Sequence, residues 1–138
     1  MAGFSTSLAN AIINATLRGQ AFPTIRTTYF ALFTADPTDA FTAGTEVAAA
    51  WYQRQPTGAF AAPSSGVSYN AVNVDFQPVN GSPVTVTHIG IVEGANPTDP
   101  TATLLYSEAL PTPKTLTVND IYSVRSQGAS GDFTLALV

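Results

Sequence analysis

Near the start of the chain, apolar residues recur at spacings of four, four and three residues, at Phe4, Leu8, Ile12 and Ala15. These spacings put the four side chains on one stripe of a helix. Ser5 is suited to the N-cap, a cation at Arg18 suits the helix dipole, and Gly19 stops the helix. The pattern predicts a helix over about residues 5–18. Its stripe either packs against the core or docks onto another subunit, so Phe4, Leu8 and Ile12 are interface candidates.

After this segment the chain changes to short β-type runs separated by turn residues. Residues 28–34 are apolar at both odd and even positions, which is typical of a strand covered on both faces. Residues 71–76 alternate between apolar and polar positions. A strand here would point three side chains inward, those of Val72, Val74 and Phe76.

The next β-type runs are irregular. Within residues 84–92 the apolar positions change phase, which predicts a β-bulge near His88 or Gly90. Residues 103–110 form another short strand pattern. The last two patterns flank the turn sequence "QGASG" and predict a hairpin with three side chains on its buried face, Phe133, Leu135 and Leu137.

Together these patterns indicate a mainly β fold. About six short strands with spacers of roughly ten residues or more favour an antiparallel β-sandwich or a small, jelly-roll-like barrel over parallel βαβ units. The helix of residues 5–18 precedes these strands. No linker-like segment divides the chain, so residues 1–138 are expected to form one domain.

Composition adds a restriction on the surface. Only 10% of the residues are charged, against roughly 25% in an average soluble domain. Such a surface repels its neighbours weakly, which suits a chain packed against copies of itself or against a partner. The net charge is −4, and the five lysines and arginines are scattered singly. This distribution argues against a nucleic-acid partner and against an anionic membrane.

Candidate catalytic chemistry is sparse. The sequence has one histidine, His88, no cysteine and no G-x-S-x-G motif. Zinc and iron sites built from several histidines or cysteines therefore cannot be assembled. We expect a protein that is not an enzyme and that uses no cofactor. The N-terminal segment lacks a basic region and a long apolar run, so neither a signal peptide nor a membrane span is expected.

Three carboxylates lie close together in the stretch "ADPTDAFTAGTE", at Asp36, Asp39 and Glu46. They are weak candidates for a calcium site, because their spacing is not the alternating one of an EF-hand loop. The alternative is ordinary turn chemistry, in which Asp36 forms an Asx turn and Pro37 holds a fixed φ at the end of a strand.

The stretch "AWYQRQ" places aromatic and polar side chains side by side, at Trp51, Tyr52 and Arg54. Such a group can stack on a sugar ring and hydrogen-bond its hydroxyls, so it is the candidate interface for a host-surface glycan. The alternative is a strand edge, with Trp51 and Tyr52 pointing in opposite directions and at least one of them in the core.

Several stretches resemble a known family. "GFSTSLANAIINATLRGQAF", "TYFALFTADPTDAFTAGTEV" and "YQRQ", followed by "VTHIGIVEG", "LLYSEAL" and "PKTLTVNDIYSV", are similar to the small tail-fibre-like proteins of tailed bacteriophages. The resemblance covers nearly the whole chain, and "ALFTADPTD" with "GTEV" is its most specific part. It implies a structural component of the virion.

The leading hypothesis is a non-enzymatic virion protein, made in the host cytoplasm and present in several copies on the exterior of the particle. Its partners would be copies of itself and other virion proteins. Two locations stay open: the tail or its fibres, and the head, where a decoration or cement protein would stabilise the shell by bridging capsomers of the major capsid protein. A carbohydrate-binding module is the third alternative.

Overall fold

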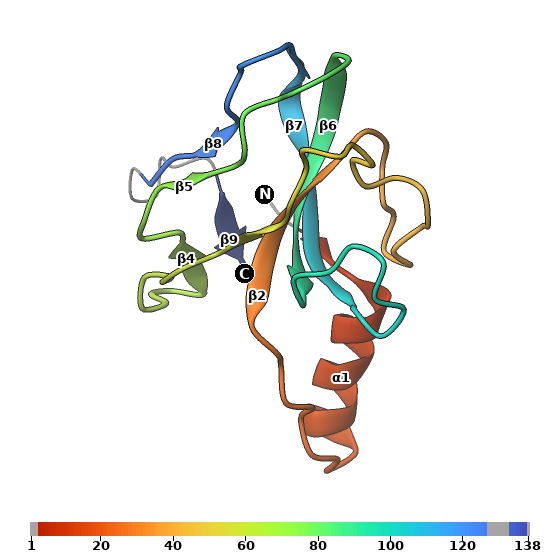
Figure 1. The fold of residues 1–138 in the computed structure, drawn as a ribbon. Coiled ribbons are helices and arrows are strands. Elements are labelled where there is room, and N and C mark those ends of the chain that lie inside the picture. Colours follow the sequence, from red (N-terminus) through yellow and green to blue (C-terminus); the bar gives the residue numbers. More distant parts are fainter. Residues whose placement is uncertain (1–2, 127–132, 138) are drawn as a thin grey trace.

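The computed structural model describes residues 3–126 and 133–137 (Figure 1). Within these residues, one helix and nine strands follow one another in this order: β1 (Gly3–Phe4), α1 (Thr6–Leu17), β2 (Thr28–Phe33), β3 (Gln55–Pro56), β4 (Val67–Tyr69), β5 (Val74–Asp75), β6 (Val84–Glu93), β7 (Leu104–Leu116), β8 (Ser123–Val124) and β9 (Thr134–Ala136). The fold is therefore mainly β with a helix near its N-terminus, as the sequence predicts.

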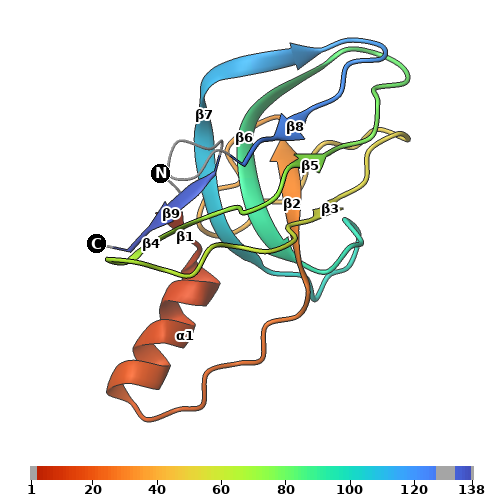
Figure 2. The ribbon, with the colours of Figure 1, turned by 90° about the vertical axis from the view of Figure 1, so that its left-hand side faces the viewer.

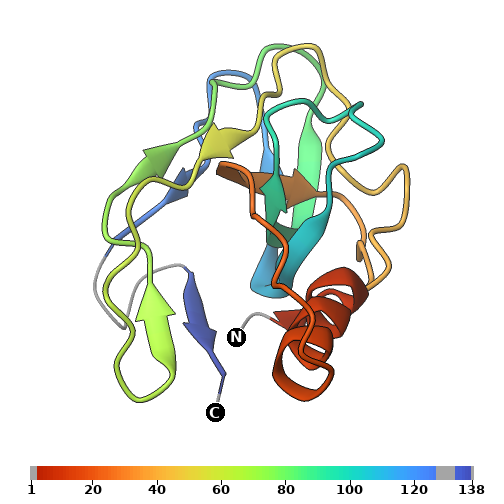
Figure 3. The same cartoon turned by 90° about the horizontal axis from the view of Figure 1, so that it is seen from below.

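Five strands form the main sheet, in the order β1-β7-β6-β2-β3, and every pair of neighbours is antiparallel. Two smaller antiparallel sheets, β4-β9 and β5-β8, lie on one side of the main sheet (Figure 2). The view from below shows these layers separated at the end near β9 and α1 (Figure 3). The architecture is sandwich-like and is not a closed barrel, so the sandwich alternative is confirmed and the barrel alternative is wrong.

Strand β2 is buried on both faces, as its apolar pattern predicts. Phe30 faces the layer between the sheets, where its ring meets Phe133 edge to face with centroids 5.5 Å apart. Phe33 lies in a second apolar cluster on the opposite face, with Val92 and Leu104. Because a β-strand alternates its side chains, burial at consecutive positions requires cover on both sides of the sheet.

The predicted bulge is present in the pairing of β6 with β7. The register shifts between Val86 and His88 on β6, which pair with Lys114 and Ala109 on β7. One residue of β6 therefore faces residues 110–113 of β7. Two of these four are prolines, which have no N–H to donate to the ladder, so the extra residues leave the pairing here.

The predicted C-terminal hairpin is wrong. β8 pairs with β5 and β9 pairs with β4, while the "QGASG" segment lies outside the described residues. Phe133 is buried, but Leu137 is half exposed. Earlier in the chain, Val72 is exposed and only Val74 and Phe76 point inward. The pairing of β8 with β5 places Val124 opposite Val74, and both side chains are buried.

The helix is confirmed with its predicted N-cap. Ser5 Oγ accepts a hydrogen bond from Leu8 N at 3.1 Å, and the chain leaves the helix at Gly19 with φ of 65°. The helix extends away from the sheets (Figures 1 and 2). No helix in the described part of the chain has the length and apolar character to cross a membrane.

Candidate functional site

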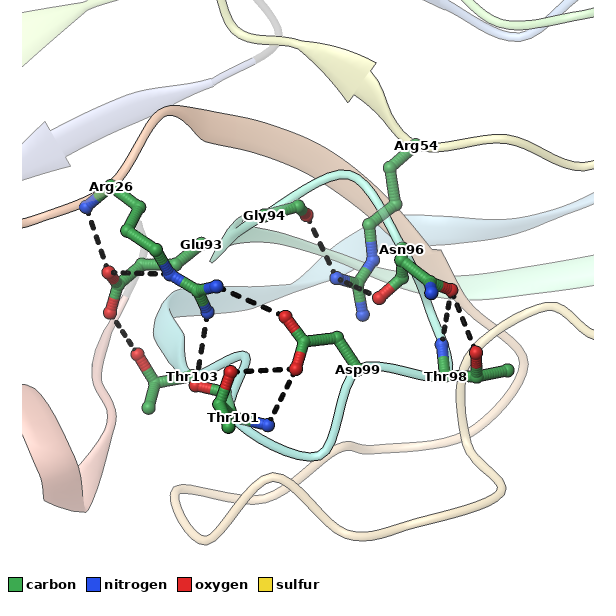
Figure 4. A network of polar contacts seen from close by, with 9 residues as sticks. All are labelled: Arg26, Arg54, Glu93, Gly94, Asn96, Thr98, Asp99, Thr101 and Thr103. Atoms are coloured by element: carbon green, nitrogen blue, oxygen red, sulfur yellow. Dashed lines mark hydrogen bonds and ion pairs between the residues drawn. The ribbon is translucent and has the colours of Figure 1, made fainter.

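The loop of residues 94–103 joins β6 to β7 and is held on one side by Arg26 (Figure 4). The guanidinium of Arg26 donates to Asp99 Oδ2 and to the Thr101 carbonyl oxygen, both at 3.1 Å. The backbone N–H of Arg26 donates to Glu93 Oε2 at 2.9 Å, and Thr103 Oγ1 donates to the other oxygen of Glu93. The segment before β2 is thus joined to both ends of the loop.

Arg54 holds the same loop from beneath. Its side chain is only 1% exposed, and its Nε and Nη2 both donate to the Glu46 carboxylate at 2.8 Å. The remaining nitrogen, Nη1, donates to the carbonyl oxygens of Gly94 at 3.0 Å and Asn96 at 3.2 Å. A bidentate pair of this kind is strong and directional, and the geometry leaves each nitrogen of the buried guanidinium with a partner. Arg54 therefore connects Glu46 to the loop at residues 94–96.

Tyr52 completes the buried end of this network. Its hydroxyl donates to Glu46 Oε1 at 2.7 Å and accepts from the backbone N–H of Leu32 at 3.0 Å. Burial, followed by the charge of Glu46, raises the pKa of Tyr52, so the hydroxyl keeps its proton and stays a donor. The ring stacks on Phe76 with centroids 6.1 Å apart. Strand β2, Glu46 and the core are joined through this one side chain.

The loop is also shaped by its own side chains. Asn96 Oδ1 accepts from the backbone and hydroxyl of Thr98, and Asp99 Oδ1 accepts in the same way from Thr101. These bonds from Thr101, with a further contribution from Arg26, lower the pKa of Asp99 to about 2. The carboxylate is therefore ionised in all but strongly acidic solution, and the loop keeps a defined shape.

Three adjoining hollows, of about 270, 320 and 300 Å³, follow the boundary between this loop and residues 39–49. Phe41 and Pro100 line the first two, and Glu46 and Pro97 line the last two. We call this continuous depression the loop groove. Its lining includes carboxylates and threonine hydroxyls but no lysine or arginine, so its chemistry suits hydrogen bonding to neutral polar groups and not binding of anions.

The three calcium candidates do not converge. Glu46 is engaged by Arg54 and Tyr52, whereas the Asp36 carboxylate accepts from Thr38 N at 2.8 Å in the predicted Asx turn. The Asp39 backbone oxygen accepts from Thr6 N, at the first turn of α1. Across residues 3–126 and 133–137, no three acidic, histidine or cysteine side chains are grouped to hold a metal ion. The acids at positions 36 and 39 belong to a turn that meets the helix.

The helical interface candidates lie against their own chain. Leu8 is buried in the core, Ile12 packs against it partly buried, and Phe4 meets Tyr106 with ring centroids 5.7 Å apart. Core packing therefore accounts for this stripe. Leu8 is already covered by its own chain, and the docking of this stripe onto another subunit stays a prediction. The exposed apolar residues of the helix lie elsewhere, at Ile13 and Leu17.

The proposed glycan patch is not formed by its three residues. Tyr52 and Arg54 are buried, so neither can stack on a sugar at the surface. Trp51 is partly buried and packs against the same core, and its ring lies edge to face with Tyr52 at 6.1 Å. Its indole N–H is buried and has no hydrogen-bond partner in the described part of the chain. Tyr52 is in the core, as the alternative expects of at least one of the two aromatic residues, and residues 51–52 lie outside any strand.

The imidazole of His88 contacts Thr87 and Asp36. Its Nδ1 is 2.8 Å from Thr87 Oγ1, and its Nε2 is 3.9 Å from a carboxylate oxygen of the exposed Asp36. The imidazole lies at the bulge of β6, where it contacts the end of the turn that follows β2. No serine hydroxyl is bonded to this ring among the contacts of the described residues.

The roles of Arg26, Glu93 and Asp99 were not predicted from the sequence. Arg26 and Asp99 are 73 positions apart, and neither belongs to a periodic pattern. One sequence signal was present: Asp99 and Asn96 each precede a threonine by two positions, a spacing typical of Asx turns. That signal predicts the local shape of the loop but not its arginine partners.

A family model described as Gp80, podophage GP4 fiber I protein gp80, matches residues 3–131 of the chain. The match covers nearly the same extent as the resemblance noted from the sequence. No curated protein matches the chain.

Proposed function

Because the chain belongs to the family of podophage GP4 fiber I protein gp80, we propose that it is an exterior module of the virion, present in several symmetric copies. The family is one of phage fibre structural proteins, and a fibre protein is a component of the virion. One surface of such a module faces outward, and another contacts its neighbours in the assembly. The loop groove and the far end of α1 are different surfaces, and their properties bear on both roles.

The observation that carries the proposal is the double anchoring of the loop of residues 94–103. Arg26 holds the loop from the solvent side and Arg54 from the buried side, through five hydrogen bonds to side-chain and backbone oxygens of residues 93–101. A loop ordered before contact loses less conformational entropy when a partner binds. This supports the loop groove as the outward contact surface, toward the host.

The helix α1 has the features of a surface for assembly contacts. The helix extends from the sheets, and its exposed apolar residues include Leu17, which is 80% exposed (Figure 1). An exposed apolar helix end is costly on a free protein and is typical of a contact surface. Low charge over the whole chain supports close packing among copies. We therefore assign assembly contacts to α1.

Chemical labelling of intact particles tests this orientation. The chain has no cysteine, so a single cysteine at exposed Ala95 in the loop, or at Leu17 on the helix, reports on one surface at a time. A membrane-impermeant maleimide should label Ala95→Cys in particles as fully as in the free protein, while Leu17→Cys should be protected. Val118→Cys, at an exposed position in a turn far along the chain, is the matched reference for access to the reagent.

Equal labelling of Ala95→Cys and Leu17→Cys in particles would contradict the assigned orientation. Protection of Ala95→Cys alone would reverse it, with the loop groove buried in assembly. Absence of the protein from purified particles would contradict the virion assignment itself. The head-decoration alternative predicts the same labelling pattern, and the location of the label by electron microscopy distinguishes it from the fibre.

A further inference from the structure

The far end of α1 presents an apolar surface. Ile13 and Leu17 are one turn apart on the same side of the helix and are 51% and 80% exposed, and Phe22, in the segment that follows, is 47% exposed. We call these three side chains the helix knob. Arg18 is the only charged residue in residues 3–25, and its guanidinium is bound to Asn14 Oδ1 at 2.9 Å. The knob is thus an apolar projection with almost no charge around it.

The second surface is an apolar groove of about 240 Å³ between the main sheet and the β4-β9 sheet. Its apolar lining consists of Phe60, Ile91, Leu105, Tyr106 and Leu135. The side chains that line it carry no charge. The volume lies below the roughly 300–1,000 Å³ of pockets that hold drug-sized ligands.

The knob of one copy is held away from the groove of the same copy. The helix begins at the rim of the groove, where Phe4 packs against Tyr106 and the backbone N–H of Ser5 donates to the Leu105 oxygen at 2.9 Å. Its 12 residues then carry Leu17 about 18 Å away, at 1.5 Å per residue. Because the helix is straight and is fixed beside the groove at its first residues, its far end cannot reach the groove of the same copy.

We propose that the helix knob of one copy inserts into the apolar groove of a neighbouring copy. Both surfaces are uncharged in an acidic chain of net charge −4, so their contact brings no like charges together and leaves no buried charge unpaired. Every other copy carries the same uncharged, apolar groove. This inference rests on the proposed function only in requiring several copies in contact.

Because the knob and the groove are different surfaces, the contact is head to tail. Repetition of a head-to-tail contact generates a closed ring where the rotation closes and a filament where it does not. Either product suits a fibre module that surrounds or extends along an axis. Three side chains form a small contact relative to the roughly 800 Å² per partner of a standard stable interface, so the free protein is expected to associate weakly and reversibly.

Disulfide trapping tests the contact directly, since the chain has no cysteine of its own. One preparation carries Leu17→Cys and a second, of different tag size, carries Ser68→Cys on β4 at the groove. Mixed under mild oxidation, they are expected to form predominantly the mixed dimer, because a disulfide requires Cα atoms within about 7 Å. A single chain with both cysteines should form a ladder of oligomers. Val118→Cys, also on an exposed apolar position, replaces Leu17→Cys in the control and should give only background.

A second measurement uses no cross-link. Leu17→Ser should weaken self-association by about tenfold or more in sedimentation equilibrium, since a largely exposed leucine would lose its burial in the neighbour. Val118→Ser should leave the association constant unchanged, and circular dichroism confirms that both variants are folded.

Mixed dimers no more abundant than with Val118→Cys would overturn the proposal. A predominance of Leu17→Cys homodimers would also overturn it, because it indicates a helix-to-helix contact instead. These failures are separable from failure of the proposed function. If particles contain the protein but trapping fails, the knob-and-groove contact is wrong and the virion role stands; if particles lack the protein, the virion role itself is wrong.

Discussion

Replacement of Arg54 by leucine tests the network that fixes the loop of residues 94–103. The substitution leaves the Glu46 carboxylate, whose side chain is 12% exposed, without its bidentate partner, and removes the donor to the Gly94 and Asn96 oxygens. Loss of one partner of a buried ion pair costs about 3–5 kcal/mol, because an uncompensated charge stays in the interior. At roughly 3 °C per kcal/mol for a domain of this size, Tm should fall by about 10–15 °C.

Thermal unfolding followed by circular dichroism, with urea unfolding for the free energy, measures this loss. Arg26→Leu is the matched control: it removes the same group from the same loop, but the Arg26 side chain is 44% exposed, and the Glu93 carboxylate keeps its hydrogen bonds from the backbone N–H of residue 26 and from Thr103 Oγ1. Its Tm should fall much less. The double variant Arg54→Leu with Glu46→Leu should be more stable than Arg54→Leu alone, because the stranded charge is gone.

A cost of less than about 1 kcal/mol for Arg54→Leu, the usual value of a surface ion pair, would show that Arg54 and Glu46 do not act as a buried pair. A purely additive double variant would equally show that the two side chains do not act as a pair.

Three further predictions follow from the same structure. The pKa of Asp99 is lowered to about 2 from its ordinary value of 3.8, so the contribution of this carboxylate to stability is present above about pH 4 and is lost as the pH falls through about 2. Carboxyl NMR titration should give that pKa, and hydrogen exchange should show residues 95–101 opening over this acid range. An ordinary pKa for Asp99 would contradict the loop geometry. Gly90→Ala should destabilise by about 1–3 kcal/mol in urea unfolding, because a Cβ there would lie 2.8 Å from the Tyr106 oxygen and 3.0 Å from the Phe33 ring, while Gly3→Ala, with open space around it, should be neutral. Asp36→Asn with Asp39→Asn should cost at most about 1 kcal/mol each and should not alter the response of Tm to calcium, since asparagine also forms the Asx turn; a calcium-dependent rise in Tm that the double variant abolishes would restore the metal hypothesis.

The features predicted correctly from the sequence are those determined locally. The cap at Ser5 and the stop at Gly19 are short-range interactions, so the limits of α1 follow from the residues themselves. The bulge in β6 was visible because a change of phase in the apolar pattern records which side chains face the core. Burial of β2 on both faces was visible for the same reason.

The errors concern partners that lie far apart in the chain. Two neighbouring strand patterns suggested a hairpin, but β8 and β9 find their partners about 50 and 70 positions earlier, at β5 and β4. Arg54 was a candidate for a glycan interface, whereas its pairing with Glu46 stabilises it in a buried position, where arginine is rare. Local sequence patterns show which side chains are present, but they do not show which of them meet when residues far apart in the chain come together.

The central claim is that this chain is an exterior, multi-copy fibre module with α1 in contact with its neighbours and the loop groove outward. Cryo-electron microscopy of intact particles, with head and tail both reconstructed, tests it most directly. The account predicts the β-sandwich repeated symmetrically in a tail fibre, with Leu17 of each copy buried in the next and residues 94–103 facing solvent. Density over the head shell would contradict the fibre location, and absence of the protein from purified particles would contradict the account as a whole.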